Sequence, residues 1–411
     1  MAVQRHVAWA CRMKSGKLVP PILMERRQVM FRVWMLMMLA LMVNPVYAVT
    51  HAIYVQSNAS QMNEVAWLLQ DTKTGKLAFK GSRETGGNGD PAINGNQAHA
   101  IASDGRYLFV ANAGDDSISV FRLLKAGQPV FTGKFASLGR HPVSLAVNHH
   151  RLLVVNQGDQ MIDGATSSIQ SFRISASGSL SPLKGRYTYL SSFVPVDITT
   201  TPSSGFFAVA LNGIDQIDFF SLLPSGVMAR MNSITGIHNP LGGAMGRLNN
   251  SRLAFTLAGD DQPGVVSIGM KGLAPETVIQ DVRPDLLDPC WAAAQSGGKY
   301  LWTSAFKTRA LTLYRWEARG SLSYLGVSIP DVEGPGGLDV TLSDDNRYLF
   351  RLRGDNVEDD TIPTRPLVDV FRVSIAGKRE GAGLSMLDQT ALPESWADAK
   401  ATGLVAVSVK P

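Results

Sequence analysis

Apolar and polar positions along this 411-residue chain follow one order that recurs about every fifty residues. Each copy has a short apolar run, a polar turn, a second apolar run ending in a small or polar residue, a loop, and an alternating run ending in an aromatic residue. The clearest copy is HAIASDGRYLFVANAGDDSISVF at 99–121. Its turn, SDGR, favours a tight reversal, and its β-branched and aromatic runs favour strands. Each copy therefore predicts a small sheet of consecutive strands.

Six copies begin with the first apolar run, and a seventh copy is split between the two ends of the chain. The six first runs begin at residues 99, 142, 196, 241, 291 and 338. Near the amino end, 52–55 and 65–69 match the second and third runs, and the missing first run is GLVAVSV at 403–409. This arrangement predicts an all-β, seven-bladed β-propeller of four-stranded blades over 49–411, closed by pairing of the N- and C-terminal strands. Two stacked β-sandwiches, the alternative, would leave the split copy unexplained.

The first 48 residues differ from the repeats. Within 24–48, the charged start MERR precedes an uncharged apolar run of 11 residues at 33–43, and the small residues Val46 and Ala48 precede the expected cut. This order is typical of a secretory signal peptide, so we expect a periplasmic or secreted protein with no membrane contact after cleavage. The apolar run is shorter than the ~20 residues that span a bilayer. An uncleaved N-terminal anchor is the alternative, and the sequence leaves a start at Met1, Met24 or Met30 open.

Removing the leader changes the charge of the chain. Seven of the 39 Lys and Arg residues and one of the 34 Asp and Glu residues lie in 1–48, which leaves 32 basic and 33 acidic residues. Nucleic acid is therefore not an expected partner, because binding a phosphate backbone requires a cationic surface. One cysteine, Cys290, remains outside the leader; its apolar neighbours favour a buried thiol over a nucleophile, and it cannot form an internal disulfide. We expect a monomer.

Two segments carry a resemblance to a known family. HAIASDGRYLFVANAGDDSISVF at 99–121 and the stretch 141–185, with HPVSLAV, LLVVNQG and SIQSFRISASGSLSPLKG, resemble the seven-bladed propellers of the lactonase family. That family includes 6-phosphogluconolactonase-like and carboxymuconate-cyclase-like proteins and relatives with YVTN-type repeats. The resemblance implies a Pro-His pair at the start of inner strands and basic residues around the channel mouth. Here the pair is partial, as Ala98-His99 and as His141-Pro142-Val143.

Long loops mark one mouth of the predicted channel as the binding side. The loops into the first strand and out of the second strand of each blade meet at this mouth. Arg140 and His141 are the first candidates for catalysis there, and His99 is the second. A histidine can act as a general base on a water molecule while an arginine holds a carboxylate or oxyanion. The alternative is that both histidines cap strand starts and bond to nearby backbone. The long loops are 82–97, 158–167 and 354–366.

Further polar residues are expected at the same mouth as substrate-binding groups. The asparagines among them also suit loop turns. The acidic pairs at 115–116 and 260–261 lack the spacing of a Ca²⁺ loop, so we expect no metal. The sequence contains no glycine-rich phosphate motif, so we expect no nucleotide cofactor. The pair His149-His150 is expected in a surface turn at the opposite mouth. The expected substrate-binding residues are His238, Asn239, Asp288, Asn112, Asn156 and Asn212.

The resemblance and these residues together predict an enzyme that hydrolyses or isomerises a small lactone or a carboxylated ligand at the channel mouth, without metal or cofactor. The alternative is a non-catalytic propeller that binds a ligand, a glycan or a protein through its long-loop face. One propeller scaffold hosts many unrelated functions, so the sequence predicts the fold more firmly than the activity.

Overall fold

The computed structural model describes most of the chain after the leader. The predicted signal peptide at 24–48 lies outside the described residues. Among the described residues, no helix is long and apolar enough to cross a membrane. The described residues are 50–93, 99–160, 162, 164–200, 205–246, 252–259, 261–272, 274–295, 297, 299–317, 321–329, 334–355, 357, 363–375 and 382–409.

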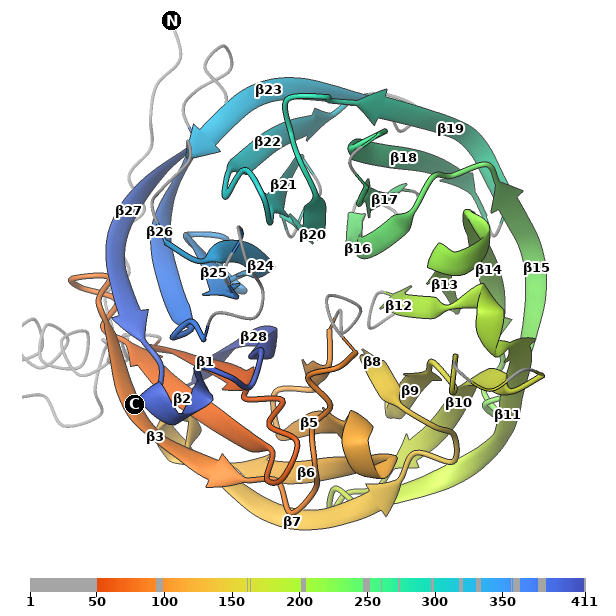
Figure 1. Cartoon of the computed structure of the whole chain (residues 1–411), viewed down its shortest axis with the longest axis horizontal. Helices are drawn as coiled ribbons and strands as arrows, with labels where there is room; N and C mark the ends of the chain where they lie inside the picture. The colour runs from red at the N-terminus through yellow and green to blue at the C-terminus, as the bar shows by residue number, and fades with distance from the viewer. Residues whose placement is uncertain are drawn as a thin grey trace, which may run out of the picture. The chain divides into compact units, whose positions relative to one another are not determined.

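The described residues form seven four-stranded antiparallel sheets arranged in a ring (Figure 1). The innermost strands are β4 (Ile101–Ser103), β8 (Pro142–Asn148), β12 (Pro195–Thr200), β16 (Pro240–Gly246), β20 (Pro289–Ala294), β24 (Gly336–Leu342) and β28 (Thr402–Val409). The second strands are β1 (Thr50–Gln56), β5 (Tyr107–Asn112), β9 (Arg151–Asn156), β13 (Phe206–Leu211), β17 (Arg252–Leu257), β21 (Tyr300–Ala305) and β25 (Tyr348–Gly354).

The third and fourth strands complete each sheet outward. The third strands are β2 (Glu64–Gln70), β6 (Ser117–Leu123), β10 (Thr166–Ile174), β14 (Gln216–Leu222), β18 (Gly264–Lys271), β22 (Leu311–Trp316) and β26 (Leu367–Ile375). The outermost are β3 (Leu77–Glu84), β7 (Pro129–Ala136), β11 (Leu180–Leu190), β15 (Met228–Thr235), β19 (Ala274–Val282), β23 (Leu322–Ile329) and β27 (Ala382–Ala391). Short 3₁₀ turns are η1 (Ala113–Asp115), η2 (Lys125–Gly127), η3 (Ser191–Phe193), η4 (Asn212–Ile214) and η6 (Glu394–Trp396).

The two ends of the described chain close the ring, as the split repeat predicts. Strand β28 pairs antiparallel with β1, with Ala52 opposite Val407 and Tyr54 opposite Val405. The last strand of the chain therefore completes the sheet that β1, β2 and β3 begin. The predicted seven-bladed, all-β propeller is confirmed. The bounds of the first two predicted long loops move slightly, because β3 extends to Glu84 and β10 begins at Thr166.

The second strand of each blade is buried on both faces, which explains its unbroken apolar sequence. In a strand, successive side chains point to opposite faces. In β5, Leu108 packs with Ala52 and Tyr54 of the preceding blade, whereas Phe109 packs with Leu152 of the following blade. The outermost strands alternate between buried or half-buried and exposed positions instead. Burial between blades thus sets the order of apolar and polar runs in each repeat.

A non-glycine residue in the left-handed conformation precedes six of the seven innermost strands. Asn, Asp and His are enriched at positive φ among non-glycine residues, because a short polar side chain tolerates this conformation. The carbonyl of this residue commonly accepts a hydrogen bond from the end of the second strand, as from Gln157 N–H to His141 O at 2.9 Å. We call these positions strand-entry residues. They are His99, His141, Val194, Asn239, Asp288 and Lys400, with φ of 51°, 52°, 48°, 46°, 56° and 51°.

Candidate active site in the central channel

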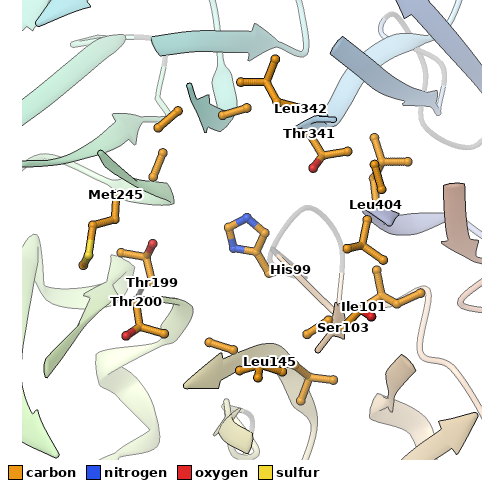
Figure 2. A pocket seen from close by; sticks show the side chains of 18 of the residues that line it. His99, Ile101, Ser103, Leu145, Thr199, Thr200, Met245, Thr341, Leu342 and Leu404 are labelled. Carbon is orange, nitrogen blue, oxygen red and sulfur yellow. The ribbon is translucent and has the colours of Figure 1, made fainter. Parts of the chain in front are cut away.

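A cavity of about 580 Å³ occupies part of the central channel. Its wall is formed by the later residues of the innermost strands and by the turns that follow them, for example Leu145, Met245 and Leu404 from three different blades. Figure 2 shows the imidazole of His99 in the middle of this ring of side chains. His99 is a strand-entry residue, so its side chain reaches into the cavity from the end at which the inner strands begin.

An ion pair across the channel holds the imidazole of His99. Its Nδ1 lies 2.8 Å from Oδ1 of Asp197, which belongs to β12, two blades further on. A carboxylate can only accept, so Nδ1 carries the hydrogen and Nε2 is the ring nitrogen left for a ligand. Asp197 is fully buried and also accepts bonds from the Ser144 hydroxyl, at 2.9 Å, and from Gly243 N–H, at 2.7 Å. Three blades therefore fix this carboxylate.

A second buried carboxylate influences His99 from blade seven. Asp339 in β24 accepts bonds from the backbone N–H groups of Val340 and Leu404, both at 2.7 Å. Burial raises the pKa of Asp339 to about 6, although the His99 cation works in the opposite direction. Burial alone would lower the pKa of His99, but the charge and hydrogen bond of Asp197, together with the charge of Asp339, raise it to about 9. His99 is therefore an imidazolium at neutral pH.

A protonated imidazole that borders a cavity can stabilise negative charge on a substrate oxygen. Its side chain is 27% exposed, so a ligand can reach it. Preorganised donors of this kind lower the energy of oxyanions that develop during acyl transfer. An imidazolium is a general acid and not a base at neutral pH. This chemistry differs from the base role that the sequence predicts for a histidine at the mouth.

Arg140 and His141, the first catalytic candidates, lie at the other end of the inner strands and do not line the cavity among its described residues. The Arg140 side chain is 57% exposed and lies 3.5 Å from the Asp159 carboxylate. The His141 backbone N–H donates to Asp116 Oδ1 at 2.8 Å, and its Nδ1 lies 3.1 Å from Gly158 O. The structure does not bring these two residues together with His99 in one cavity.

The remaining predicted residues also lie at the strand-entry end. His238 bonds to Asp261 at 2.7 Å and faces Asp215 at 3.5 Å. Asn239 and Asp288 are strand-entry residues, and Asn212 donates to the side chain of Asn239. These contacts tie one loop to the next; a role in substrate binding stays a prediction.

The other two predicted asparagines are buried between loops. The Asn112 carbonyl accepts bonds from Asn63 and Thr85, and its amide donates to Ser117 and Ser119 at 3.0 and 2.8 Å. The Asn156 amide donates to the Ser137 carbonyl at 3.4 Å. Both amides therefore already bond to the protein itself, and their predicted contact with substrate is not tested by these bonds.

The acidic pairs and the thiol have local partners. Asp115 binds Lys134 at 2.8 Å, while Asp116 holds the His141 N–H, and Asp260 lies outside the described residues. Within the described part of the chain, no group of three or more His, Cys, Asp and Glu side chains is placed to hold a metal ion. Cys290 is buried, as predicted, and burial together with Asp288 raises its thiol pKa well above the usual range.

Sequence reasoning missed the two carboxylates that surround His99. Asp197 and Asp339 are single acidic residues near the start of otherwise apolar inner strands, in PVDITT and GGLDVTL. Ser144 and Gly243 stand near the start of their strands in the same way. The pairing register shifts close to each of these positions, as between Pro195 and Asp197. Such bulges commonly re-aim a side chain, and an isolated acid in an apolar strand was the available signal.

Comparison with known proteins supports one family. The family model "Lactonase, 7-bladed beta-propeller" matches residues 51–186, from β1 into β11. The resemblance to the lactonase family is confirmed. Within this lactonase-like propeller the match contains His99 and Ser144, whereas Asp197 and Asp339 lie beyond it. A search of curated proteins finds no match to the chain.

Solved structures share the fold of the lactonase-like propeller at low sequence identity. A candidate 6-phosphogluconolactonase from Bacteroides fragilis has a TM-score of 0.64 and 14% identity, covering 87% of this chain and 98% of its own. The periplasmic gluconolactonase of Pseudomonas aeruginosa has a TM-score of 0.63 and 16% identity, covering 88% and 99%. Hydrazine synthase of Kuenenia stuttgartiensis has a TM-score of 0.56 and 16% identity, covering 79% and 95%. The fold therefore occurs with unrelated activities.

Proposed function

We propose that this lactonase-like propeller hydrolyses a small lactone bound in the channel cavity. The observation that carries the proposal is the His99 imidazolium, which Asp197 holds at 2.8 Å and which borders a cavity of about 580 Å³. That volume is typical of small-molecule sites. The family match and the gluconolactonase of similar fold agree with a lactone as the ligand class.

The proposed reaction uses His99 as the acid. A water oxygen bonds to the lactone carbonyl carbon, and Nε2–H of His99 stabilises the negative charge that develops on the carbonyl oxygen. The ring C–O bond then breaks, and the leaving ring oxygen takes the Nε2 proton to become a hydroxyl group. The added water loses its protons, one to restore His99 and one to solvent, as the product carboxylic acid ionises. No metal or cofactor enters these steps.

Initial rates of acid release from a panel of five- and six-membered lactones at pH 7 test this proposal. We expect turnover of at least one lactone by the wild-type protein and a loss of about 10³-fold in His99→Gln. Glu276→Gln on the outermost strand β19, where the residue is exposed, is the matched control and should keep the wild-type rate. Equal rates for His99→Gln and wild type would overturn the catalytic role.

A non-catalytic binding propeller is the second candidate. The observation that favours it is that His99, Asp197 and Asp339 also join three blades across the channel, which stabilises the ring without chemistry. Under this alternative, calorimetry detects saturable binding of a lactone or of its open hydroxy acid, but no wild-type turnover is measured.

We also propose that the protein is exported to the periplasm or secreted. The charged start, the apolar run at 33–43 and the small residues before position 49 support this proposal. Amino-terminal sequencing of protein recovered from a periplasmic or culture fraction should begin near Val49. Recovery of only full-length chain in the membrane fraction would contradict export with cleavage.

A further inference from the structure

The ionisable groups of the cavity carry an excess of negative charge. Among the described residues that line it there is no Lys or Arg; the ionisable ones are His99, His149, Asp104 and Asp344. The last three lie in turns at one end of the channel, directly after β4, β8 and β24. Even with both histidines protonated, these two acids and the carboxylates that flank His99 outnumber the cations.

The positive charge of His99 is already balanced. Asp197 bonds to it at 2.8 Å, and Asp339 adds a second carboxylate on the channel side of blade seven. A ligand anion approaching Nε2 therefore meets a neutralised cation, and it also meets the carboxylates of Asp104 and Asp344 at the turns. Fields of one sign inside a low-dielectric cleft strongly bias which charged ligands enter it.

The rest of the wall suits an uncharged ligand. Apolar side chains such as Leu145, Val147 and Met245 alternate with the hydroxyl groups of Thr200 and Thr341. The innermost strands are also the inner edges of their sheets, and a sheet edge offers neutral N–H and C=O groups. Ring hydroxyls and alkyl groups can both be accommodated on this surface.

We propose that the channel cavity selects uncharged lactones and rejects phosphorylated or carboxylated ones. This inference depends on the proposed lactone hydrolysis and specifies its substrate class. It excludes the carboxylated ligands that the sequence analysis allowed. It also excludes 6-phosphogluconolactone as a good substrate of this protein.

The direct test compares D-glucono-δ-lactone with its 6-phosphate on the full-length protein. We expect kcat/KM for the uncharged lactone to exceed that for the phosphorylated one by about tenfold or more. Raising the ionic strength should increase kcat/KM for the phosphorylated lactone, because salt screens repulsion. A phosphorylated lactone that reacts as well as the uncharged one, or that reacts more slowly in salt, overturns the proposal.

Charge removal at the turns provides the second test. Asp104→Asn and Asp344→Asn should together raise the ratio of phosphorylated to uncharged kcat/KM several-fold. Asp104 Oδ1 accepts backbone bonds from Arg106 and Tyr107, and an asparagine oxygen can still accept them. The single Asp344→Asn variant is the fallback if the double variant fails to fold. Glu276→Gln removes one negative charge on β19, outside the cavity, and should leave the ratio unchanged. No change in the ratio for folded cavity variants contradicts the inference.

A binding measurement separates this inference from the proposed reaction. Calorimetry with 1,5-anhydro-D-glucitol and its 6-phosphate, neither of which contains a lactone bond, reports selection by charge without turnover. Binding of the uncharged compound alone supports the cavity's selectivity even if no lactone is hydrolysed, in which case only the proposed reaction fails. Preferred binding of the phosphate, or binding of neither compound, overturns the selectivity.

Discussion

His99 and His141 enter the innermost strands of two successive blades with nearly the same backbone conformation, φ of 51° and 52°. Their surroundings differ. The His141 ring lies against the Gly158 carbonyl and 4.0 Å from Asp90, in loops at the strand-entry end. The His99 ring crosses the channel to Asp197 and borders the cavity.

The comparison teaches that a histidine in the left-handed conformation ahead of an inner strand can serve either the fold or a site. The two histidines are offset within the repeat, because Ile101 pairs with Val110 as Leu145 pairs with Val154, so His99 corresponds to Val143. The left-handed conformation favours His, Asn and Asp at strand entry for reasons of local sterics. A catalytic environment arises only where partners from distant blades converge on the side chain. For His99 those partners stand 98 and 240 residues later in the sequence. The contacts of His141 are with Gly158, Asp116 and Asp90, in three loops at the strand-entry end.

The largest expected difference is in catalysis. His99→Gln should lower kcat/KM for a lactone by about 10³-fold, because Gln carries no acidic proton to donate. His141→Gln should lower it by less than about threefold, because its ring does not line the cavity. Acid-release rates on matched preparations check this difference. Equal losses in the two variants would remove the distinction between the two histidines.

The next effect is on stability. Asp197→Asn should lower the free energy of unfolding by about 3 kcal/mol, because it leaves the His99 cation without its buried partner. Asp116→Asn should lower it by about 1 kcal/mol or less, because an amide oxygen can still accept the His141 N–H bond. Urea unfolding followed by tryptophan fluorescence measures both. A smaller loss for Asp197→Asn than for Asp116→Asn would contradict the importance of the ion pair.

The pH dependence of the free energy of unfolding should reveal the ion pair at His99. The His99 pKa is raised in the folded protein, from 6.5 to about 9. Folding therefore favours the protonated form, and this contribution is complete below pH 6.5 and disappears as the pH rises through about 9. Subtracting the unfolding free energy of His99→Gln from that of the wild type at pH 6, 8 and 10 should give a falling series. An NMR titration of the imidazole with a midpoint near its ordinary value would rule this out.

The smallest effect is expected at Arg140. Its guanidinium is mostly exposed and 3.5 Å from Asp159, and exposed pairs of this kind contribute little. Arg140→Gln should change the free energy of unfolding by less than about 0.5 kcal/mol and the lactone rate by less than about twofold. Chemical denaturation and initial rates are the measurements. A large loss of activity would indicate that catalysis occurs at the strand-entry end of the channel, as the sequence predicts.

Sequence patterns predicted the architecture and one member of the site. The repeat identified seven blades, and the split copy identified the pairing of β28 with β1, because burial between blades imposes the same apolar runs each time. His99 was also chosen, although as a second candidate behind Arg140 and His141. Loop length placed the predicted site at the end of the channel where the inner strands begin. The cavity among the described residues instead extends toward the turns that follow the inner strands.

The amino-acid order alone determined the blade count, the closure of the ring and the polar strand-entry positions, because these follow from local sterics and from burial that repeats along the chain. Tertiary structure alone decided which of these residues share a site. Asp197, Asp339 and His99 belong to three blades, and only ring closure brings their charges together, so the imidazolium is a property of the assembled channel and not of any one repeat.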